Sequence, residues 1–442
     1  MLTYLAIKLI FLNSIMIQAT IITIGDELLI GQVIDTNSAW MAQELNKAGI
    51  PVKRRVAVGD VWDEIWNALN EESKQADIIL ITGGLGPTAD DITKPLLCKY
   101  FGGKLIVDEG ARQNVVNIFS RLNRPMIERN LLQAEVPDVC TVIQNKRGTA
   151  PGMWFERPHP SSPEGEEKKT VFVSMPGVPH EMKGMMEDEV IPQLAKQFKL
   201  ASIVHRTLLT AGVGESFLAD LIQHFETALP THIKLAYLPN YGMVRLRLSS
   251  AGFDKAAIEK EVNEQFEQLQ SLVKEYLVTN MDEPMEQVVG KLLLQQNKTM
   301  CTAESCTGGY IAHLLTSITG SSAFYDGSVV SYSYGAKEDL LGVNHQTLLT
   351  HGAVSEEVVT EMAKGALRNI KSDYTIAVSG IMGPGGGMPE KPVGTVWVAV
   401  GNADKIVAQK LFFRFDRTRN IQLTAVTALN LLRKFIVEQV HS

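Results

Sequence analysis

The sequence contains few cysteines and no excess of positive charge, and each shortage excludes a class of protein. The four cysteines of the 442-residue chain lack both the density of a disulfide scaffold and the spacing of a zinc site, so we expect reduced thiols in a cytoplasmic protein. A net charge of −7 argues against a general nucleic-acid-binding protein. The ordinary content of 45% hydrophobic and 21% charged residues predicts a folded chain of roughly two to four domains.

The chain begins with an apolar stretch, residues 2–17, that contains Lys8 and Asn13. A membrane-spanning helix needs about 20 apolar residues, so this stretch is short for one, and no clear small-residue cleavage site follows it. Met16 directly precedes a predicted strand. We therefore expect residues 1–15 to be an upstream extension and the protein to have no membrane anchor; the alternative is a membrane or export segment.

Strands and helices alternate in the first hundred residues. We predict strands at residues 19–25, 52–58 and 77–82, and helices at 37–48, 62–75 and from about 92. The third strand consists almost entirely of isoleucine and leucine, which is typical of a parallel sheet buried on both faces. Ligands of such sheets bind at the carboxyl ends of the strands.

Two of these strands end in acidic residues, and one of the two also ends in a glycine-rich loop before a helix. Such a loop suits a phosphate group, and carboxylates beside a phosphate suggest a bridging divalent cation. The candidates are Gly83, Gly84 and Gly86 for the phosphate, and Glu27, Asp90 and Asp91 for the metal ion. The alternative is that Asp90 or Asp91 caps the helix and Asp26 makes a turn.

Residues 204–279 form a smaller predicted unit in the order strand, helix, strand, strand, helix. The run Gly212-Val213-Gly214-Glu215 resembles the GxxG loop of a KH domain. A nucleic-acid-binding loop needs basic residues around it, and this segment lacks them. A structural spacer is therefore the favoured interpretation.

The alternating pattern resumes after Pro284 and predicts a second three-layer α/β domain. We predict strands at residues 298–303, 328–334, 374–379 and 394–400, and helices at 285–296, 309–316, 355–370 and 421–437.

Ser305 lies where the first of these strands ends and a helix begins, within Ala303-Glu304-Ser305-Cys306-Thr307-Gly308-Gly309. Backbone N–H groups at a helix start are unpaired and favour negative charge, so those of residues 307–309 are candidates to stabilise an oxyanion. Ser305 is then a candidate nucleophile. The alternative is that Ser305 or Thr307 only caps the helix.

A serine nucleophile needs a base, and no histidine is obviously placed for that task. Lys337 follows at a predicted helix start, where the helix dipole favours a neutral amine, and Tyr332 is a candidate to relay the proton or orient the lysine. The alternative is a surface lysine and a packed strand tyrosine. Cys306 is a rival nucleophile, because a helix start lowers the pKa of a thiol.

A third motif, the glycine-rich segment 379–387, follows another buried strand and could wrap a phosphate or ribose; it is not a Walker loop. Arginines before the last helix could pair with an anionic substrate or be solvated surface charges. The candidate substrate contacts are Thr307, Gly308, Gly309, Ser379, Gly380, Gly383, Arg417 and Arg419.

Together and in this order, these motifs resemble the CinA C-terminal domain, the nicotinamide-nucleotide amidohydrolase family. The resemblance implies hydrolysis of the carboxamide of nicotinamide mononucleotide to nicotinate mononucleotide and ammonia, without a cofactor. It also implies a serine nucleophile with a lysine/tyrosine pair, carried onto Ser305, Lys337 and Tyr332. The arginine pattern of the family is only partly matched, which leaves open which arginine meets the phosphate.

The first domain resembles the molybdopterin-binding fold of the MoaB/MogA type found at the N terminus of CinA proteins. This resemblance implies a metal-dependent ADP-ribose pyrophosphatase, small-molecule nucleotides as ligands, and a homodimer. We therefore expect two three-layer α/β domains with mainly parallel sheets, residues 17–175 and 281–442, joined by a small α+β KH-like domain at 176–280. The alternative is a molybdopterin-binding or competence-associated protein without catalytic activity.

Overall fold

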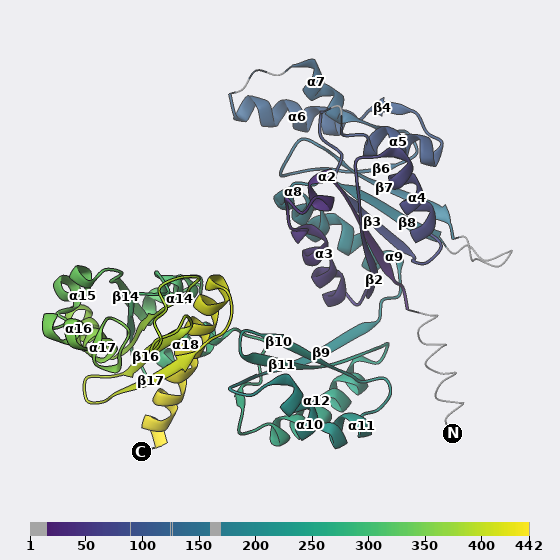
Figure 1. The fold of residues 1–442 in the computed structure, drawn as a ribbon. Helices are drawn as coiled ribbons and strands as arrows, with labels where there is room; N and C mark the ends of the chain where they lie inside the picture. The colour runs from purple at the N-terminus through teal and green to yellow at the C-terminus, as the bar shows by residue number, and fades with distance from the viewer. Residues whose placement is uncertain (1–15, 89, 124, 126, 160–168, 442) are drawn as a thin grey trace. The chain divides into compact units, whose positions relative to one another are not determined.

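The computed structural model describes residues 16–441 except 89, 124, 126 and 160–168 (Figure 1). The prediction made for residues 1–15 lies outside this range. The contacts divide the chain into two compact units, one made of residues up to 204 with 250–260 and the other of 205–249 with 261–442. Among the described residues, no helix is long and apolar enough to cross a membrane.

The first unit is built on a six-stranded sheet in the order β2-β1-β3-β8-β7-β6. Its strands are β1 (Ala19–Ile24), β2 (Val52–Val58), β3 (Ile78–Thr82), β6 (Thr141–Ile143), β7 (Gly152–Pro158) and β8 (Lys169–Met175). The pairs from β2 to β8 are parallel, and β7 alone runs against the others because it pairs antiparallel with both neighbours. The predicted mainly parallel sheet is confirmed.

Helices cover both faces of this sheet, and each face has its own apolar core. One face packs on α4 (Trp62–Glu72) and α5 (Thr93–Phe101), and the other on α3 (Thr36–Lys47), α8 (Pro179–Met185) and α9 (Ile191–Gln197), the last two joined by a π-helical turn. Smaller elements flank the sheet: α2 (Asp26–Leu29), α6 (Glu109–Arg121), α7 (Glu128–Leu131), β4 (Leu105–Val107) and β5 (Glu135–Pro137).

The structure differs from the predicted domain boundary after residue 175. The helical segment 179–197, which the sequence pattern grouped with the middle domain, packs on the first sheet. Its apolar side chains, among them Met182, Met186 and Leu194, are fully buried in that core. Burial of this helical face, rather than its position after a glycine- and proline-rich turn, decides where the segment belongs.

The middle sheet has the order β10-β11-β9-β12. Its elements are β9 (Ser202–Ala211), α10 (Glu215–Leu221), α11 (Gln223–Ala228), β10 (Lys234–Asn240), β11 (Met243–Gly252), α12 (Lys255–Leu272) and β12 (Leu277–Thr279). The predicted order of strands and helices is confirmed, with the first helix divided in two. The short edge strand β12 was not predicted.

The C-terminal domain contains a five-stranded sheet in the order β14-β13-β15-β16-β17. The strands are β13 (Met300–Glu304), β14 (Tyr325–Val330), β15 (Tyr374–Gly380), β16 (Thr395–Gly401) and β17 (Ile406–Phe412). Only β16 runs against the rest, since it pairs antiparallel with both neighbours. One face carries α13 (Met285–Gln295), α14 (Tyr310–Thr316) and α18 (Arg417–His441), the other α15 (Tyr334–Leu341), α16 (His345–His351) and α17 (Glu356–Ile370).

This arrangement confirms the second three-layer α/β domain but corrects one strand. The strand predicted at 328–334 ends at Val330, because the side chain of Ser333 accepts a hydrogen bond from the N–H of Ala336 and starts α15. Tyr332 therefore lies in the connection between β14 and α15 and not in a strand. The helix α16 and the edge strand β17 were not predicted.

The close packing of α15 on α17 gives a stability prediction. A Cβ atom added at Gly365 would lie 2.0 Å from the carbonyl oxygen of Leu341, so Gly365→Ala must push the helices apart. We expect it to destabilise the C-terminal domain by about 1–3 kcal/mol. The matched control is Gly335→Ala in α15, where nothing lies within 4 Å and a gain of about 0.5 kcal/mol is expected. Calorimetry of the full chain measures both, and equal effects would contradict the packing.

Candidate functional site

Ser305 directly follows β13, a strand with β14 and β15 on either side. Its N–H donates to the carbonyl of Val378 at 3.1 Å, and its carbonyl accepts from the N–H of Gly308 at 3.1 Å. The side chain is 8% exposed and borders a cavity of about 160 Å³. The cavity is lined by Ser305, Cys306, Tyr332, Lys337, Ala353, Val354, Ser379, Gly380, Met382 and Arg417.

Lys337 lies beside the serine, as the sequence predicted. Its Nζ is 3.0 Å from Ser305 Oγ and donates to the carbonyls of Ser331 at 2.7 Å and Tyr332 at 3.4 Å. The side chain is 1% exposed, and burial lowers the pKa of its amine. A neutral amine has two N–H donors and one lone pair, so the two carbonyls take the donors and the lone pair is left for the serine hydroxyl.

Tyr332 occupies a different place from the one a proton relay needs. Its side chain is 64% exposed, and its hydroxyl accepts a hydrogen bond from Arg417 Nη2 at 3.2 Å. Within the described part of the chain, no hydrogen bond joins this hydroxyl to Lys337 or Ser305. Tyr332 instead supports the lysine through its backbone carbonyl, and its phenol forms a side of the cavity together with Arg417.

The structure separates the two candidate arginines. Arg417 borders the cavity, and its Nη1 donates to the carbonyl of Gly383 at 2.9 Å. The guanidinium of Arg419 lies 4.1 Å from the ring centre of Phe415 and does not border the cavity. Arg417 is therefore the arginine placed to meet an anionic substrate.

The glycine-rich segment 379–387 begins within β15 and meets the cavity at Ser379, Gly380 and Met382. Ser379 and Gly380 border the cavity, and Ser379 Oγ donates to the carbonyl of Ala353 at 2.7 Å. The hydroxyl of Ser379 thus already has an acceptor, which fixes its direction. Gly383 contributes through its carbonyl, which holds Arg417.

The alternative nucleophile, Cys306, is not in a setting that makes a thiol reactive. The residue is 5% exposed and packs in the apolar core of the domain. Burial raises the pKa of its thiol to about 12, which outweighs any favourable effect of the nearby helix. Of the two candidates, Ser305 is the one that has the amine of Lys337 beside it.

Glu304 is a site residue that the sequence pattern did not reveal. Its carboxylate is completely buried and accepts hydrogen bonds from the hydroxyl of Thr307 at 2.7 Å and from the N–H groups of Gly309, Ile311 and Ala312 at 3.1, 3.0 and 2.8 Å. These are the unpaired donors at the start of α14, so Glu304 supplies the negative charge that this helix end favours. The sequence feature that could have revealed Glu304 is its position as an acidic residue at the end of a buried strand.

This carboxylate changes the predicted oxyanion site. The N–H of Gly308 donates to Ser305 and that of Gly309 to Glu304, so neither is open to a substrate. The hydroxyl of Thr307 also faces Glu304. In the turn of residues 305–310, all of which are described, the N–H groups of Cys306 and Thr307 are the ones that donate to no acceptor.

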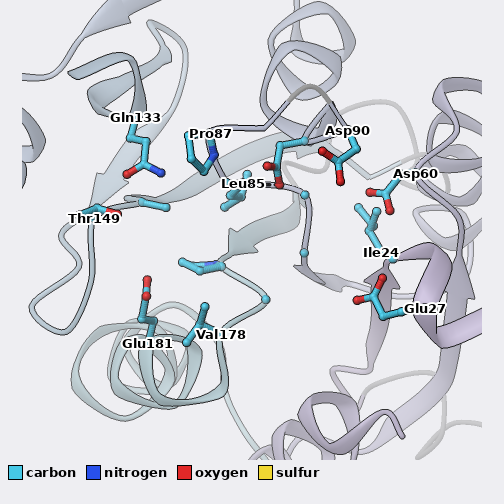
Figure 2. Close-up of a pocket in the computed structure, with 18 residues that line it drawn as sticks. Ile24, Glu27, Asp60, Leu85, Pro87, Asp90, Gln133, Thr149, Val178 and Glu181 are labelled. Atoms are coloured by element: carbon cyan, nitrogen blue, oxygen red, sulfur yellow. Dashed lines mark hydrogen bonds between the residues drawn. The ribbon is translucent and has the colours of Figure 1, made fainter. Parts of the chain in front are cut away.

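The first domain has a larger cavity, of about 380 Å³, at the carboxyl ends of its strands. All six residues predicted there border it: Glu27, Gly83, Gly84, Gly86, Asp90 and Asp91. Figure 2 shows Glu27, Asp60 and Asp90 along one side, and Gln133, Thr149 and Glu181 along the other. Four of these six were not predicted as site residues: Asp60, Gln133, Thr149 and Glu181.

Asp91 has a structural role that makes it a poor metal ligand. Its Oδ1 accepts from the N–H of Gly86 at 2.7 Å, and its Oδ2 accepts from the N–H of Thr88 at 2.9 Å and from the Thr88 hydroxyl. Both oxygens are therefore used to hold the glycine-rich loop. The helix-cap alternative does not hold for Asp91 either, because its donors lie in the loop and no side chain caps the start of α5.

Asp60 joins Glu27 and Asp90 at the acidic side of the cavity. Burial raises the pKa of its carboxyl group, and the neighbouring charges of Asp26, Glu27 and Asp90 raise it further. Across the residues that the structure describes, no three Asp, Glu, His or Cys side chains are grouped closely enough to hold a metal ion by themselves. Any ion here needs oxygen ligands from a bound substrate or from water.

Three family models match the chain in order. A model of a probable molybdopterin binding domain matches residues 20–196, one of the damage-inducible protein CinA KH domain matches 205–279, and one of the CinA C-terminal domain matches 282–436. The first match includes all but the last residue of the helical segment 179–197, in agreement with the packing of this segment on the first sheet.

Similar proteins match this chain over nearly its whole length. CinA-like proteins of Cytophaga hutchinsonii and Flavobacterium psychrophilum are 44% and 42% identical over 422 and 423 residues, which cover 96% and 95% of this chain and 99% of each relative. A solved CinA superfamily protein from Klebsiella pneumoniae is 35% identical, covers 35% of this chain and 99% of its own, and has a TM-score of 0.34.

The domains thus define a three-part protein with a molybdopterin-binding fold, a KH domain and a CinA C-terminal domain. The chain belongs to the CinA family.

The buried carboxylate of Glu304 gives a second stability prediction. Glu304→Ala leaves the donors at the start of α14 without their acceptor in a buried site, and we expect a loss of about 3–5 kcal/mol in the stability of the C-terminal domain. The control is Glu356→Ala, an exposed acid in the first turn of α17, with an expected loss of about 0.3–1 kcal/mol. Denaturation of both variants compares them; similar losses would show that burial of Glu304 contributes nothing.

Proposed function

We propose that the C-terminal domain hydrolyses the carboxamide of nicotinamide mononucleotide, with Ser305 as nucleophile and neutral Lys337 as its base. The observation that carries the proposal is the 3.0 Å contact between a buried lysine amine and a nearly buried serine hydroxyl at the edge of a cavity. Burial of a charged amine without a carboxylate partner is costly. Neither alternative, a surface lysine or a serine that only caps a helix, accounts for the burial of Lys337 beside Ser305.

The proposed reaction uses only side chains and backbone groups of the chain. Lys337 takes the hydroxyl proton as Ser305 Oγ bonds to the carboxamide carbon, and the N–H groups of Cys306 and Thr307 stabilise the oxyanion. The carbon–nitrogen bond breaks, and the proton on Lys337 passes to the departing ammonia. A water molecule then gives a proton to Lys337, attacks the ester and releases the acid, and Ser305 recovers its proton.

The place of Arg417 favours a nucleotide over a free amide, and the size of the cavity limits which part of the nucleotide enters. Pockets that enclose a drug-sized molecule measure about 300–1,000 Å³, whereas this one measures about 160 Å³. Only the pyridine end of the substrate is therefore proposed to enter. The exposed guanidinium of Arg417 at the rim then pairs with the phosphate.

Ammonia release from nicotinamide mononucleotide tests the proposal directly. We expect Ser305→Ala and Lys337→Met to lower kcat by at least ~10³-fold, because each removes a partner of the same proton transfer. The control Cys306→Ala, at the neighbouring position, should keep the nucleophile and lose far less activity. Full activity in Ser305→Ala, or loss only in Cys306→Ala, would show that the nucleophile is misassigned.

The pH dependence follows from the same pair. Protonation of Lys337 removes the lone pair that accepts the serine proton, so activity needs the neutral amine. Because burial lowers the pKa of Lys337, kcat/KM should rise with pH through an apparent pKa below the ordinary lysine value and then level off. A profile that rises only in the range of an exposed lysine, or that falls with pH in this range, would contradict a neutral lysine base.

We propose a second activity for the first domain, cleavage of the pyrophosphate of ADP-ribose with a divalent cation. It is supported by a glycine-rich loop and three carboxylates on one cavity. Mg²⁺ in nucleotide sites takes one or two carboxylates together with phosphate oxygens, which suits Glu27, Asp60 and Asp90 in the absence of a three-residue cage. When bound, the ion would neutralise phosphate charge and activate water.

Both proposed substrates are breakdown products of NAD, which gives one chain two related tasks. The alternative, a molybdopterin-binding or competence-associated protein without catalysis, leaves the buried Ser305–Lys337 pair without a role.

Release of AMP and ribose 5-phosphate from ADP-ribose measures the second activity. We expect it to require Mg²⁺ or Mn²⁺, to vanish in EDTA, and to fall at least ~10-fold in Asp60→Asn, which keeps the shape of the side chain but not its charge. The Ser305→Ala variant serves as the matched control and should cleave ADP-ribose normally. Cleavage that persists unchanged in EDTA would refute the metal-dependent mechanism.

A further inference from the structure

The first domain has another cavity, of about 340 Å³, away from the carboxyl ends of its strands. It is bordered by residues near the ends of α4 and α5 and by the neighbouring strands β7 and β8. Thr170, the second residue of β8, borders this cavity, whereas the cavity with the glycine-rich loop begins at Pro176, just beyond the last residue of the same strand. The two cavities therefore lie at opposite ends of β8, and no described residue borders both.

The hydroxyl group of Thr170 has no partner in the described part of the chain. The residue is 1% exposed, and its Oγ1 is buried without a hydrogen bond. Thr170 is paired with Arg157 on the adjacent strand, so the two side chains lie on the same face of the sheet. A buried hydroxyl without a partner costs free energy, and a ligand that bonds to it removes this cost.

Arg157 is held in a fixed position with N–H groups to spare. Its guanidinium carbon lies 4.3 Å from the ring centre of Tyr100, and its Nη2 donates to the carbonyl of Tyr100 at 2.6 Å. These contacts fix the plane of the guanidinium and use a single N–H group. The remaining N–H groups form a fork of the shape that matches a phosphate or a carboxylate.

The end of α4 supplies further donors to the same cavity. Asn70 Oδ1 accepts from the Tyr100 hydroxyl at 3.0 Å, which leaves the NH₂ group of the amide for a ligand. Lys74 is exposed, and its ammonium has no ion-pair partner among the described residues. The described border of the cavity thus holds two cations and no carboxylate, the reverse of the acidic side of the first cavity.

We propose that this cavity is a binding site for a sugar phosphate. Arg157 and Lys74 pair with the phosphate, because two cations match the roughly −2 charge of a phosphate monoester better than the single charge of a carboxylate. Asn70 and Thr170 bond to hydroxyl groups of the sugar, which a bare phosphate ion lacks. The volume of about 340 Å³ is near the lower end of the range of about 300–1,000 Å³ for small-molecule sites. The site depends on neither proposed activity.

Calorimetric titration of the full chain with ribose 5-phosphate in EDTA tests the site. We expect Lys74→Met and Thr170→Val each to weaken binding about fivefold, because each removes one polar contact to the ligand. Thr170→Val also replaces an unpaired hydroxyl with a methyl group of similar shape, so the melting temperature should stay the same or rise. The control is Lys99→Met, an exposed lysine of α5 that does not border the cavity and should keep the native affinity.

Probes that carry only part of the ligand separate the outcomes. Inorganic phosphate and ribose should each bind at least ~10-fold more weakly than ribose 5-phosphate. Tighter binding of AMP, also weakened in Thr170→Val, would support the site and show that its sugar phosphate belongs to a nucleotide. Equal binding of inorganic phosphate and ribose 5-phosphate would overturn the recognition of a sugar.

Native affinity for ribose 5-phosphate in both Lys74→Met and Thr170→Val would place the ligand elsewhere in the protein and overturn the site. A lower melting temperature of Thr170→Val without weaker binding would show that this hydroxyl has only a structural role, which also contradicts the proposal. None of these measurements depends on cleavage of ADP-ribose or on release of ammonia, so the site and the proposed activities can fail separately.

Discussion

The C-terminal site depends on a single buried charge, the carboxylate of Glu304. It accepts hydrogen bonds from the donors at the start of α14 and so fixes the turn that carries Ser305. Without it, these donors would be buried and unpaired, and the helix end would attract another anion. With it, the only N–H groups of the described turn that donate to no acceptor are those of Cys306 and Thr307, next to Ser305.

Burial also sets the properties of Lys337, the proposed base. Lys337 is the fourth residue of α15, and its amine is turned inward to the carbonyls of Ser331 and Tyr332. No carboxylate is among its hydrogen-bond partners, so burial works against the charged form and lowers its pKa. A lysine surrounded by carbonyl acceptors and one hydroxyl is prepared to accept a proton.

The sequence predicted the two α/β domains and the pairing of Ser305 with Lys337 because both are encoded locally. Strand periodicity marks the buried sheets, and Ser305 and Lys337 sit at helix starts that the pattern reveals. The roles of Glu304, Asp60, Gln133 and Glu181 depend on which residues face each other after folding, which spacing along the chain does not encode. For the same reason the sequence left Cys306 open as a rival to Ser305 and assigned the helical segment 179–197 to the wrong domain, since burial decides both.

Acid quenching of the reaction with nicotinamide mononucleotide, followed by peptide mass spectrometry, tests the proposed chemistry most directly. The proposal predicts a covalent acyl group, nicotinate mononucleotide joined as an ester, on the peptide that contains Ser305, and its absence in Ser305→Ala. The same acyl group on Cys306, or ammonia release with no acyl-enzyme at any time during turnover, would contradict a Ser305 nucleophile activated by Lys337.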